Sequence, residues 1–170
     1  MIELRHLPRD AANEVITRWH RHHKPVRSHY WATGAWVDDE LLGVVIVGRP
    51  VARALCNGKT AEVVRLACRG GDSNVGSRLL GSAYRAARAM GFTRLVSYTR
   101  QDEPGTVYRA AGWHPCARVK GRAHAGGNRP GRWLPGLYEP STEIVDRIRW
   151  EIGPDAGLRM VNGEECSHLA

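Results

Sequence analysis

The sequence contains no run of eighteen apolar residues, which is about the length that a membrane-spanning helix requires. Its first residues, MIELRHLPRD, also lack the basic segment followed by an apolar core that defines a secretory signal peptide. Neither an internal repeat nor a shift in composition marks a domain boundary. We therefore expect a cytoplasmic protein with a single domain over residues 1–152, followed by a C-terminal tail at 153–170 without a structural pattern.

Cysteine is scarce, and no Cys-x-x-Cys pair occurs among Cys56, Cys68, Cys116 and Cys166. This spacing favours free thiols in a reducing compartment over a disulfide framework. Acidic residues are outnumbered, because 25 Lys and Arg stand against 17 Asp and Glu and give a net charge of +8. Such a charge fits a polyanion such as nucleic acid or an anionic cofactor such as a nucleotide, although many basic proteins bind neither.

Apolar periodicity and turn residues predict an alternation of strands and helices in one domain. The expected strands are Ile2–His6, Trp31–Val37, Leu41–Val51, Ala61–Cys68, Leu95–Thr99, His114–Lys120 and Ile144–Ile152. The expected helices begin near Asp10, at Asn74 and at Pro104, and they end before Pro25, Gly91 and Gly112. The Gly- and Pro-rich segment at 121–140 predicts a long mobile loop or lid.

The segment Thr60–Trp113 organises the rest of the chain, since it reads as strand, Gly-rich turn, helix, strand and short helix. One stripe of the long helix is apolar, and its members are Val75, Leu79, Leu80, Ala83, Ala86, Ala87 and Met90. Helix starts bind phosphate groups through their free amides, so the turn before Ser77 is a candidate anion site.

This order of elements resembles the GNAT superfamily of acyl-CoA-dependent N-acetyltransferases over residues 2–152. Glu62–Cys68 resembles the central strand whose amides pair with pantetheine, and Asn74–Leu80 resembles the end of the pyrophosphate turn. Val107–Trp113 resembles the tyrosine-bearing short helix of the family. The resemblance implies an α/β (α+β) fold with a mixed, mostly antiparallel central sheet flanked by helices, and a cofactor turn between the fourth strand and the following helix.

The turn departs from the family pattern, which usually reads Gln/Arg-x-x-Gly-x-Gly/Ala. Gly71, Asn74 and Gly76 occupy the corresponding places, so the basic first residue is missing. Arg69 and Arg78 are close enough in sequence to supply the charge instead. Asn tolerates the left-handed conformation better than most residues, so the turn can keep its shape.

The family likeness implies acetyl-CoA as cofactor and an amine as acceptor. The residues implied to bind the cofactor are Leu66, Ala67, Cys68, Arg69, Asn74, Val75, Gly76, Ser77 and Arg78. Tyr108 either protonates the leaving thiolate or only packs beside Trp113. Glu62 either acts as the base or forms an ion pair with Arg65 or Arg49, and an undistorted strand would place Glu62 and Arg65 on opposite faces.

A narrower likeness, to the phage Mu type of DNA-modifying protein (the Mom family), depends on a histidine-rich helix exit, a Gly-Arg turn and a Ser-Tyr strand. The corresponding residues are His20 or His23, Gly48-Arg49 and Ser97-Tyr98. This likeness implies catalytic roles for His20 and His23 and acceptor binding by Arg49 and Tyr98. A metal site formed by the two histidines with Glu62 is a weaker alternative, and we expect no metal.

Three functions stay open at this point. The first is an N-acetyltransferase that joins acetyl-CoA and an amine directly in a ternary complex. The second is a Mom-like DNA or RNA base modifier, and the third is a binding module without catalysis. The basic and aromatic residues of the long loop, Arg122, His124, Arg129, Arg132 and Trp133, fit nucleic-acid contact or a merely solvated loop equally well.

Overall fold

The computed structural model describes residues 1–19, 25–70, 74–121 and 145–156. Its elements in chain order are β1 (Glu3–His6), α1 (Arg9–Trp19), β2 (Trp31–Val37), β3 (Glu40–Gly48), the 3₁₀ turn η1 (Arg53–Leu55), β4 (Thr60–Cys68), α2 (Val75–Ala89), β5 (Arg94–Arg100), α3 (Thr106–Ala110), β6 (His114–Val119) and β7 (Arg147–Ile152). The predicted order of elements is confirmed. Across the described part of the chain, no helix is long and apolar enough to cross a membrane.

The seven strands form one sheet in the order β1-β2-β3-β4-β5-β7-β6. Among the strands of the described residues, the central pair, β4 and β5, runs parallel, and the other neighbouring pairs are antiparallel. The predicted mixed, mostly antiparallel sheet is therefore confirmed. The hairpin between β2 and β3 closes on Asp38 and Asp39 with φ of 46° and 62°, which the tight primed hairpin turn requires and Asp tolerates.

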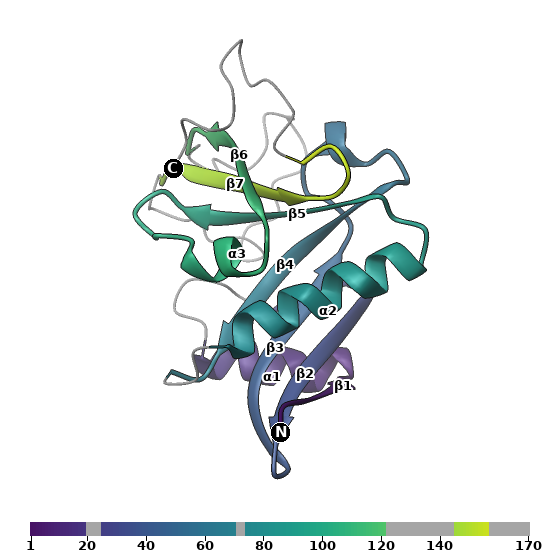
Figure 1. Ribbon diagram of the computed structural model, residues 1–170, viewed down its shortest axis with the longest axis vertical. Helices are drawn as coiled ribbons and strands as arrows, with labels where there is room; N and C mark the ends of the chain where they lie inside the picture. Colours follow the sequence, from purple (N-terminus) through teal and green to yellow (C-terminus); the bar gives the residue numbers. More distant parts are fainter. Residues whose placement is uncertain (20–24, 71–73, 122–144, 157–170) are drawn as a thin grey trace, which may run out of the picture.

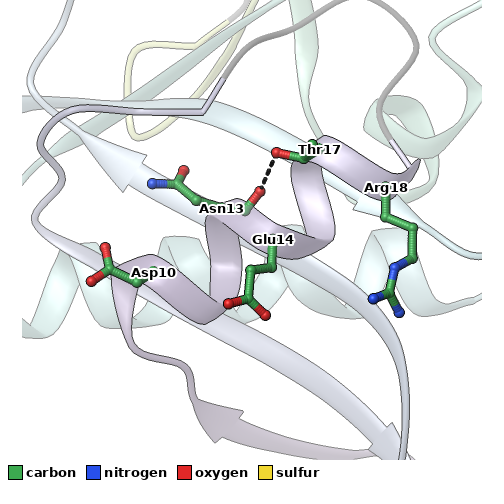
Figure 2. Close-up of a pocket in the computed structure, with 5 residues that line it drawn as sticks. All are labelled: Asp10, Asn13, Glu14, Thr17 and Arg18. Atoms are coloured by element: carbon green, nitrogen blue, oxygen red, sulfur yellow. Dashed lines mark hydrogen bonds between the residues drawn. The ribbon is translucent and has the colours of Figure 1, made fainter.

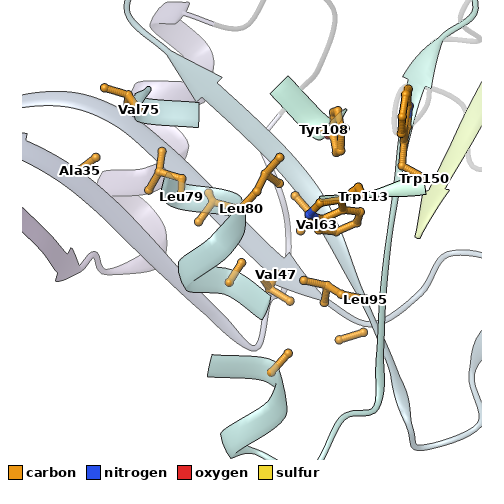
Figure 3. Close-up of a cluster of buried hydrophobic side chains, with 14 of the residues drawn as sticks. Ala35, Val47, Val63, Val75, Leu79, Leu80, Leu95, Tyr108, Trp113 and Trp150 are labelled. Carbon is orange, nitrogen blue, oxygen red and sulfur yellow. The ribbon is translucent and has the colours of Figure 1, made fainter. Parts of the chain in front are cut away.

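Helix α2 covers one face of the sheet and α1 covers the other (Figure 1). The predicted stripe of α2 packs on the sheet through Val75, Leu79, Leu80, Ala83 and Ala87 (Figure 3). Met90 was predicted to belong to this stripe and is 59% exposed, because the helix ends at Ala89 and Met90 is its cap. On the opposite face, Ala12 and Ile16 of α1 pack against Val44 and Ile46 of β3.

Covering both faces explains why β3 is almost continuously apolar, as expected for a central strand. Val44, Val45, Ile46 and Val47 are all fully buried, alternately toward α1 and α2. Burying such a side chain contributes about 1.5–3 kcal/mol relative to exposure, so this strand anchors the sheet next to β4.

Candidate active site

Strands β4 and β5 separate at the centre of the sheet (Figure 1). They pair only from Thr60 with Arg94 to Val63 with Ser97, although β4 continues to Cys68 and β5 to Arg100. We call the region beyond Val63 and Ser97 the split. The start of α2 and the short helix α3 lie on one side of it (Figure 1).

The backbone of β4 presents hydrogen-bond donors to the split. The amide of Arg69 donates to the carbonyl of Leu42 across the β3 edge at 2.8 Å. Successive amides of a strand point to opposite edges, so those of Leu66 and Cys68 point away from β3 and toward the split. These two residues, rather than Ala67 between them, therefore offer the donors that the sequence predicted for this strand.

A β-bulge at Val64 changes which residues share a face of β4. Ile46 of β3 pairs with Arg65, whereas the next residue, Val47, pairs with Val63, so Val64 is the extra residue. The positions that pack toward α2 accordingly change from odd to even numbers: Ala61, Val63, Leu66 and Cys68. Glu62 and Arg65 thus lie on the same face, on the side of α1, which an undistorted strand would not allow.

The Glu62 carboxylate is buried at the start of the split, with 5% of the residue exposed. Its Oε2 accepts a hydrogen bond of 2.9 Å from the backbone amide of Val51. Burial raises the pKa of Glu62, and the Val51 amide and the guanidinium groups of Arg65 and Arg147 oppose that rise. A carboxylate with a raised pKa and a fixed orientation is suited to accept a proton.

The same face carries further charged residues on β5 and β7. Glu151 is fully buried, and its carboxylate lies 2.8 Å from Nε of Arg149 and 3.7 Å from Nε of Arg94. Burial raises the pKa of the Tyr98 phenol, the nearby Glu62 raises it further, and Arg149 lowers it. The α1 side of the split is therefore rich in charged side chains. The Glu62 carboxylate lies close enough to the Tyr98 phenol to raise its pKa.

The α2 side of the split is mostly aromatic, and its buried polar contacts are few: Trp150 Nε1 donates to Thr99 Oγ1 at 2.9 Å, and a pair of hydroxyl groups lies nearby. The Tyr108 phenol and the Ser97 hydroxyl are 2.8 Å apart, and Ser97 Oγ also donates to the carbonyl of Val63 at 3.1 Å. Tyr108 stacks on Trp150 with ring centroids 5.4 Å apart and meets the edge of Trp113 at 5.5 Å (Figure 3). Burial raises the pKa of Tyr108 to about 12, although Ser97 lowers it.

The start of α2 differs from the expectation in one respect. Asn74 has φ −113° and ψ −5°, so it does not use the left-handed conformation that Asn tolerates, because it already adopts the right-handed conformation of the helix that it precedes. Its side chain makes no capping hydrogen bond, and Ser77 Oγ donates to its carbonyl instead. Among the described residues, the amides of the first turn of α2 thus receive no cap from the Asn74 side chain, and a helix start of this kind can bind an anion.

The neighbouring predicted cofactor residues have partners of their own. The guanidinium of Arg69 forms an exposed ion pair with Glu40, whereas Arg78 is exposed on the first turn of α2. A Cβ at Gly76 would lie 2.7 Å from Cγ1 of Val107, so this glycine lets α2 and α3 approach closely. The Cys68 thiol packs toward α2, and burial raises its pKa to about 11, which disfavours the thiolate.

Arg49 follows β3, and several other predicted residues lie outside the described ranges. Arg49 is exposed near Cys56 and Tyr30, on the loop that leads to Val51. His20, His23, Gly71, the loop at 122–140 and the tail from 157 lie outside the described residues. Within the described ranges, no three His, Cys, Asp or Glu residues are grouped closely enough to hold a metal ion, and the thiols of Cys56 and Cys68 are free.

A hollow on the surface of α1 is separate from the split. Figure 2 shows its lining side chains, Asp10, Asn13, Glu14, Thr17 and Arg18, pointing outward from that helix. The Thr17 hydroxyl is already bonded to the Asn13 carbonyl at 2.9 Å. Since no residue of the split lines this hollow, it adds nothing to the candidate active site.

Sequence reasoning missed the contributions of Arg147 and Glu151, and it gave no role of its own to Ser97. The alternation of β7 did place Arg147 and Arg149 on the face opposite Trp150, and this was the available signal. The proximity of Arg147 to Glu62 and of Arg149 to Tyr98 depends on the strand order, because β7 pairs with β5 although the two strands are far apart in the sequence.

Comparison with known proteins agrees with the architecture. Three solved structures share the fold: an IAA acetyltransferase from Bacillus cereus ATCC 14579 (15% identity, TM-score 0.65, covering 90% of this chain and 99% of that one), a Bacillus subtilis acetyltransferase in complex with CoA (17%, 0.61, 89% and 97%), and the ribosomal-protein-S18-alanine N-acetyltransferase from Escherichia coli (12%, 0.61, 90% and 94%). Another is an acetyltransferase of the GNAT family from Streptococcus pneumoniae. At these identities the likeness shows the fold, which is that of GNAT acetyltransferases.

No curated protein sequence matches the chain. A family model does, and it is the model of the Mom protein family, which aligns with residues 1–128. The aligned region runs from β1 through the split to the end of β6, so it contains Glu62, Ser97 and Tyr108. This chain belongs to the Mom protein family and has a GNAT-type fold.

Proposed function

We propose that the protein transfers an acyl group from an acyl-CoA thioester to an amino group, with both substrates bound at the split. The observation that carries this proposal is the position of two different acid–base groups on the two sides of the split: Glu62 on the α1 side and Tyr108 on the α2 side. A solved relative with the same fold binds CoA, which supports a CoA thioester as the donor. We propose acetyl-CoA as the simplest such donor.

The chain offers suitable contacts along the length of such a molecule. The first-turn amides of α2, Val75 to Ser77, together with Arg78 provide positive charge for the pyrophosphate. The amides of Leu66 and Cys68 point to the split, where the pantetheine chain would add as a partial strand to β4. One of these amides would also donate to the thioester oxygen as negative charge develops there.

Glu62 and Tyr108 would then each carry out one of the two proton transfers. Glu62 accepts the proton of the attacking amine as the new C–N bond forms. The C–S bond breaks, and Tyr108 supplies a proton to the sulfur that leaves. Holding both substrates in one orientation removes much of the entropic barrier, which is the main contribution that a ternary complex makes.

Calorimetric titration with acetyl-CoA tests the proposal. We expect a 1:1 complex whose affinity falls several-fold in Arg78→Ala, since one charge contact to phosphate is lost. Arg88→Ala, an exposed change at the other end of α2, is the matched control and should bind like the wild type. Absence of binding at high micromolar acetyl-CoA would contradict the proposal and favour a module without catalysis.

We propose a nucleobase amino group in DNA or RNA as the acceptor, because the chain belongs to the Mom family and carries a net charge of +8. Tyr98 and Arg49 are our proposed acceptor contacts, and His20 and His23 stay a proposal for catalysis. Mass spectrometry of nucleosides from cells that express the protein tests this. A nucleoside of increased mass should appear with the wild type and disappear with Glu62→Gln, whereas an unchanged nucleoside profile would exclude this acceptor.

A further inference from the structure

The Ser97 hydroxyl lies at the point where the split begins, since Val63 and Ser97 are the last paired residues of β4 and β5. Its oxygen has two neighbours within hydrogen-bond distance, the Val63 carbonyl at 3.1 Å and the Tyr108 phenol at 2.8 Å. A carbonyl oxygen can only accept, so the single proton of Ser97 is donated to Val63. Tyr108 must therefore donate its own proton to Ser97.

This assignment has a consequence for Tyr108. Its proton is held by Ser97, and its ring is fixed between Trp150 and Trp113. Once that proton has left, the phenolate oxygen would remain buried in the core, where an ionised group is strongly disfavoured. Among the side chains described, the hydroxyl that the structure places within hydrogen-bond distance of this oxygen is Ser97.

We propose that Ser97 is a positioning residue, which orients the Tyr108 phenol in the resting protein and then stabilises the phenolate by turning its own hydroxyl toward it. The inference rests on the proposed acyl transfer, in which Tyr108 supplies the proton to sulfur. In that step the O–H bond of Tyr108 breaks and an S–H bond forms on the leaving thiolate. Ser97 keeps its proton throughout and only exchanges the Val63 carbonyl for the phenolate as acceptor, until solvent returns a proton to Tyr108.

The competing explanation is structural: Ser97 would serve only to satisfy the Val63 carbonyl at the end of the parallel pairing. Both explanations predict that Ser97→Ala lowers stability, because either way a buried hydrogen bond is lost. They differ over Tyr108, because only the positioning role links the acidity of the phenol to the Ser97 hydroxyl. The test must therefore measure the phenol itself.

Placing 3,5-difluorotyrosine at position 108 makes this measurement possible by ¹⁹F NMR, since fluorine makes the phenol acidic enough to titrate while the protein stays folded. We expect Ser97→Ala to raise the pKa of this phenol, lowering its acid dissociation constant about tenfold, which corresponds to one pKa unit. Ser97→Thr keeps the hydroxyl and should stay within about threefold of the parent. Ser97→Cys fills the same space with a weak donor and should behave like alanine. An unchanged dissociation constant in the alanine and cysteine variants would overturn the proposal.

A kinetic cycle supplies the second readout. Ser97→Ala should lower kcat about tenfold with little change in acetyl-CoA affinity, and it should have no further effect in a Tyr108→Phe background. If the two substitutions lowered kcat independently, so that their fold-losses multiplied in the double variant, the positioning role would be overturned. The fluorine titration does not need turnover, so a protein that shows the shift but transfers no acyl group would count against the proposed function and not against the Ser97–Tyr108 linkage.

Discussion

The two sides of the split differ sharply, although the same strands form both. On the α2 side, Tyr108, Trp113 and Trp150 pack with Ser97, and the polar contacts there join uncharged groups. On the α1 side, Glu62 and Tyr98 lie within reach of several arginines. Alternation along each strand produces this division, and the bulge at Val64 brings the charge of Arg65 to the side that holds Glu62.

This difference separates two physical roles. The aromatic side has little charge to titrate, so changes there should act mainly on packing and on the proton of Tyr108. The charged side contains buried groups that are tolerated because they are paired, as Glu151 is with Arg149, so changes there should act on pH dependence. The following predictions test this separation, beginning with the largest expected effect.

Replacing Glu62 with glutamine should lower kcat about 100-fold, because the buried carboxylate that accepts the amine proton becomes an amide of similar size. Acetyl-CoA affinity should stay within about twofold, since the cofactor contacts lie further along β4 and on α2. In the wild type, activity should rise with pH through a pKa above the ordinary glutamate value, because burial raises it. Glu14→Gln, an exposed change on α1, is the control. Full activity of Glu62→Gln would show that Glu62 is not the base.

Substituting Gly105 with alanine should lower the free energy of unfolding by about 2 kcal/mol. Gly105 has φ +62°, and a Cβ there would overlap the Trp150 ring on which Tyr108 stacks. Gly91→Ala is the matched control: its φ is +88°, but a Cβ there would meet no atom within 4 Å, so only the backbone cost of about 1 kcal/mol applies. Denaturant unfolding compares the two, and equal losses would mean that the aromatic stack tolerates displacement.

Much of the fold could be predicted from local sequence. The strands Trp31–Val37 and Leu41–Val51, the α2 stripe and the short helix with Tyr108 all follow from periodicity and turn residues within a few positions. These features need only nearby residues to specify them. That is why the order of the elements could be predicted from the sequence.

The parts that could not be predicted depend on pairing between distant strands. Nothing in the sequence of β4 marks Val64 as a bulge, since the extra residue is defined by the register with β3. The contact of Glu151 with Arg94 likewise requires β7 to add beside β5. The conformation of Asn74 depends on the residue at which α2 begins. Helix boundaries are set by packing as well as by local sequence, so this residue could not be predicted.

Replacing Arg65 with methionine should move the acid limb of kcat/KM to higher pH. The Arg65 cation favours the ionised form of Glu62 and so lowers its pKa, and methionine keeps much of the side-chain volume without the charge. The pKa of Glu62 therefore rises in the variant, and at pH 6 we expect about threefold lower activity that recovers as pH increases. Arg88→Met on α2 should leave the profile unchanged. A uniform loss at every pH would show that Arg65 acts by packing or by binding the acceptor instead.

The smallest effect is expected at the exposed ion pair of Arg69 and Glu40, where the end of β4 meets the hairpin. Both side chains are more than half exposed, so Glu40→Gln should change the free energy of unfolding by less than about 0.5 kcal/mol. It also releases the Arg69 charge near the start of α2, so acetyl-CoA should bind about twofold more tightly in low salt, and the gain should vanish at high salt. Glu3→Gln, which breaks a similarly exposed pair with Arg5 on β1, should leave cofactor affinity unchanged. Weaker binding in Glu40→Gln would mean that the pair with Glu40 holds Arg69 in the orientation that the cofactor needs.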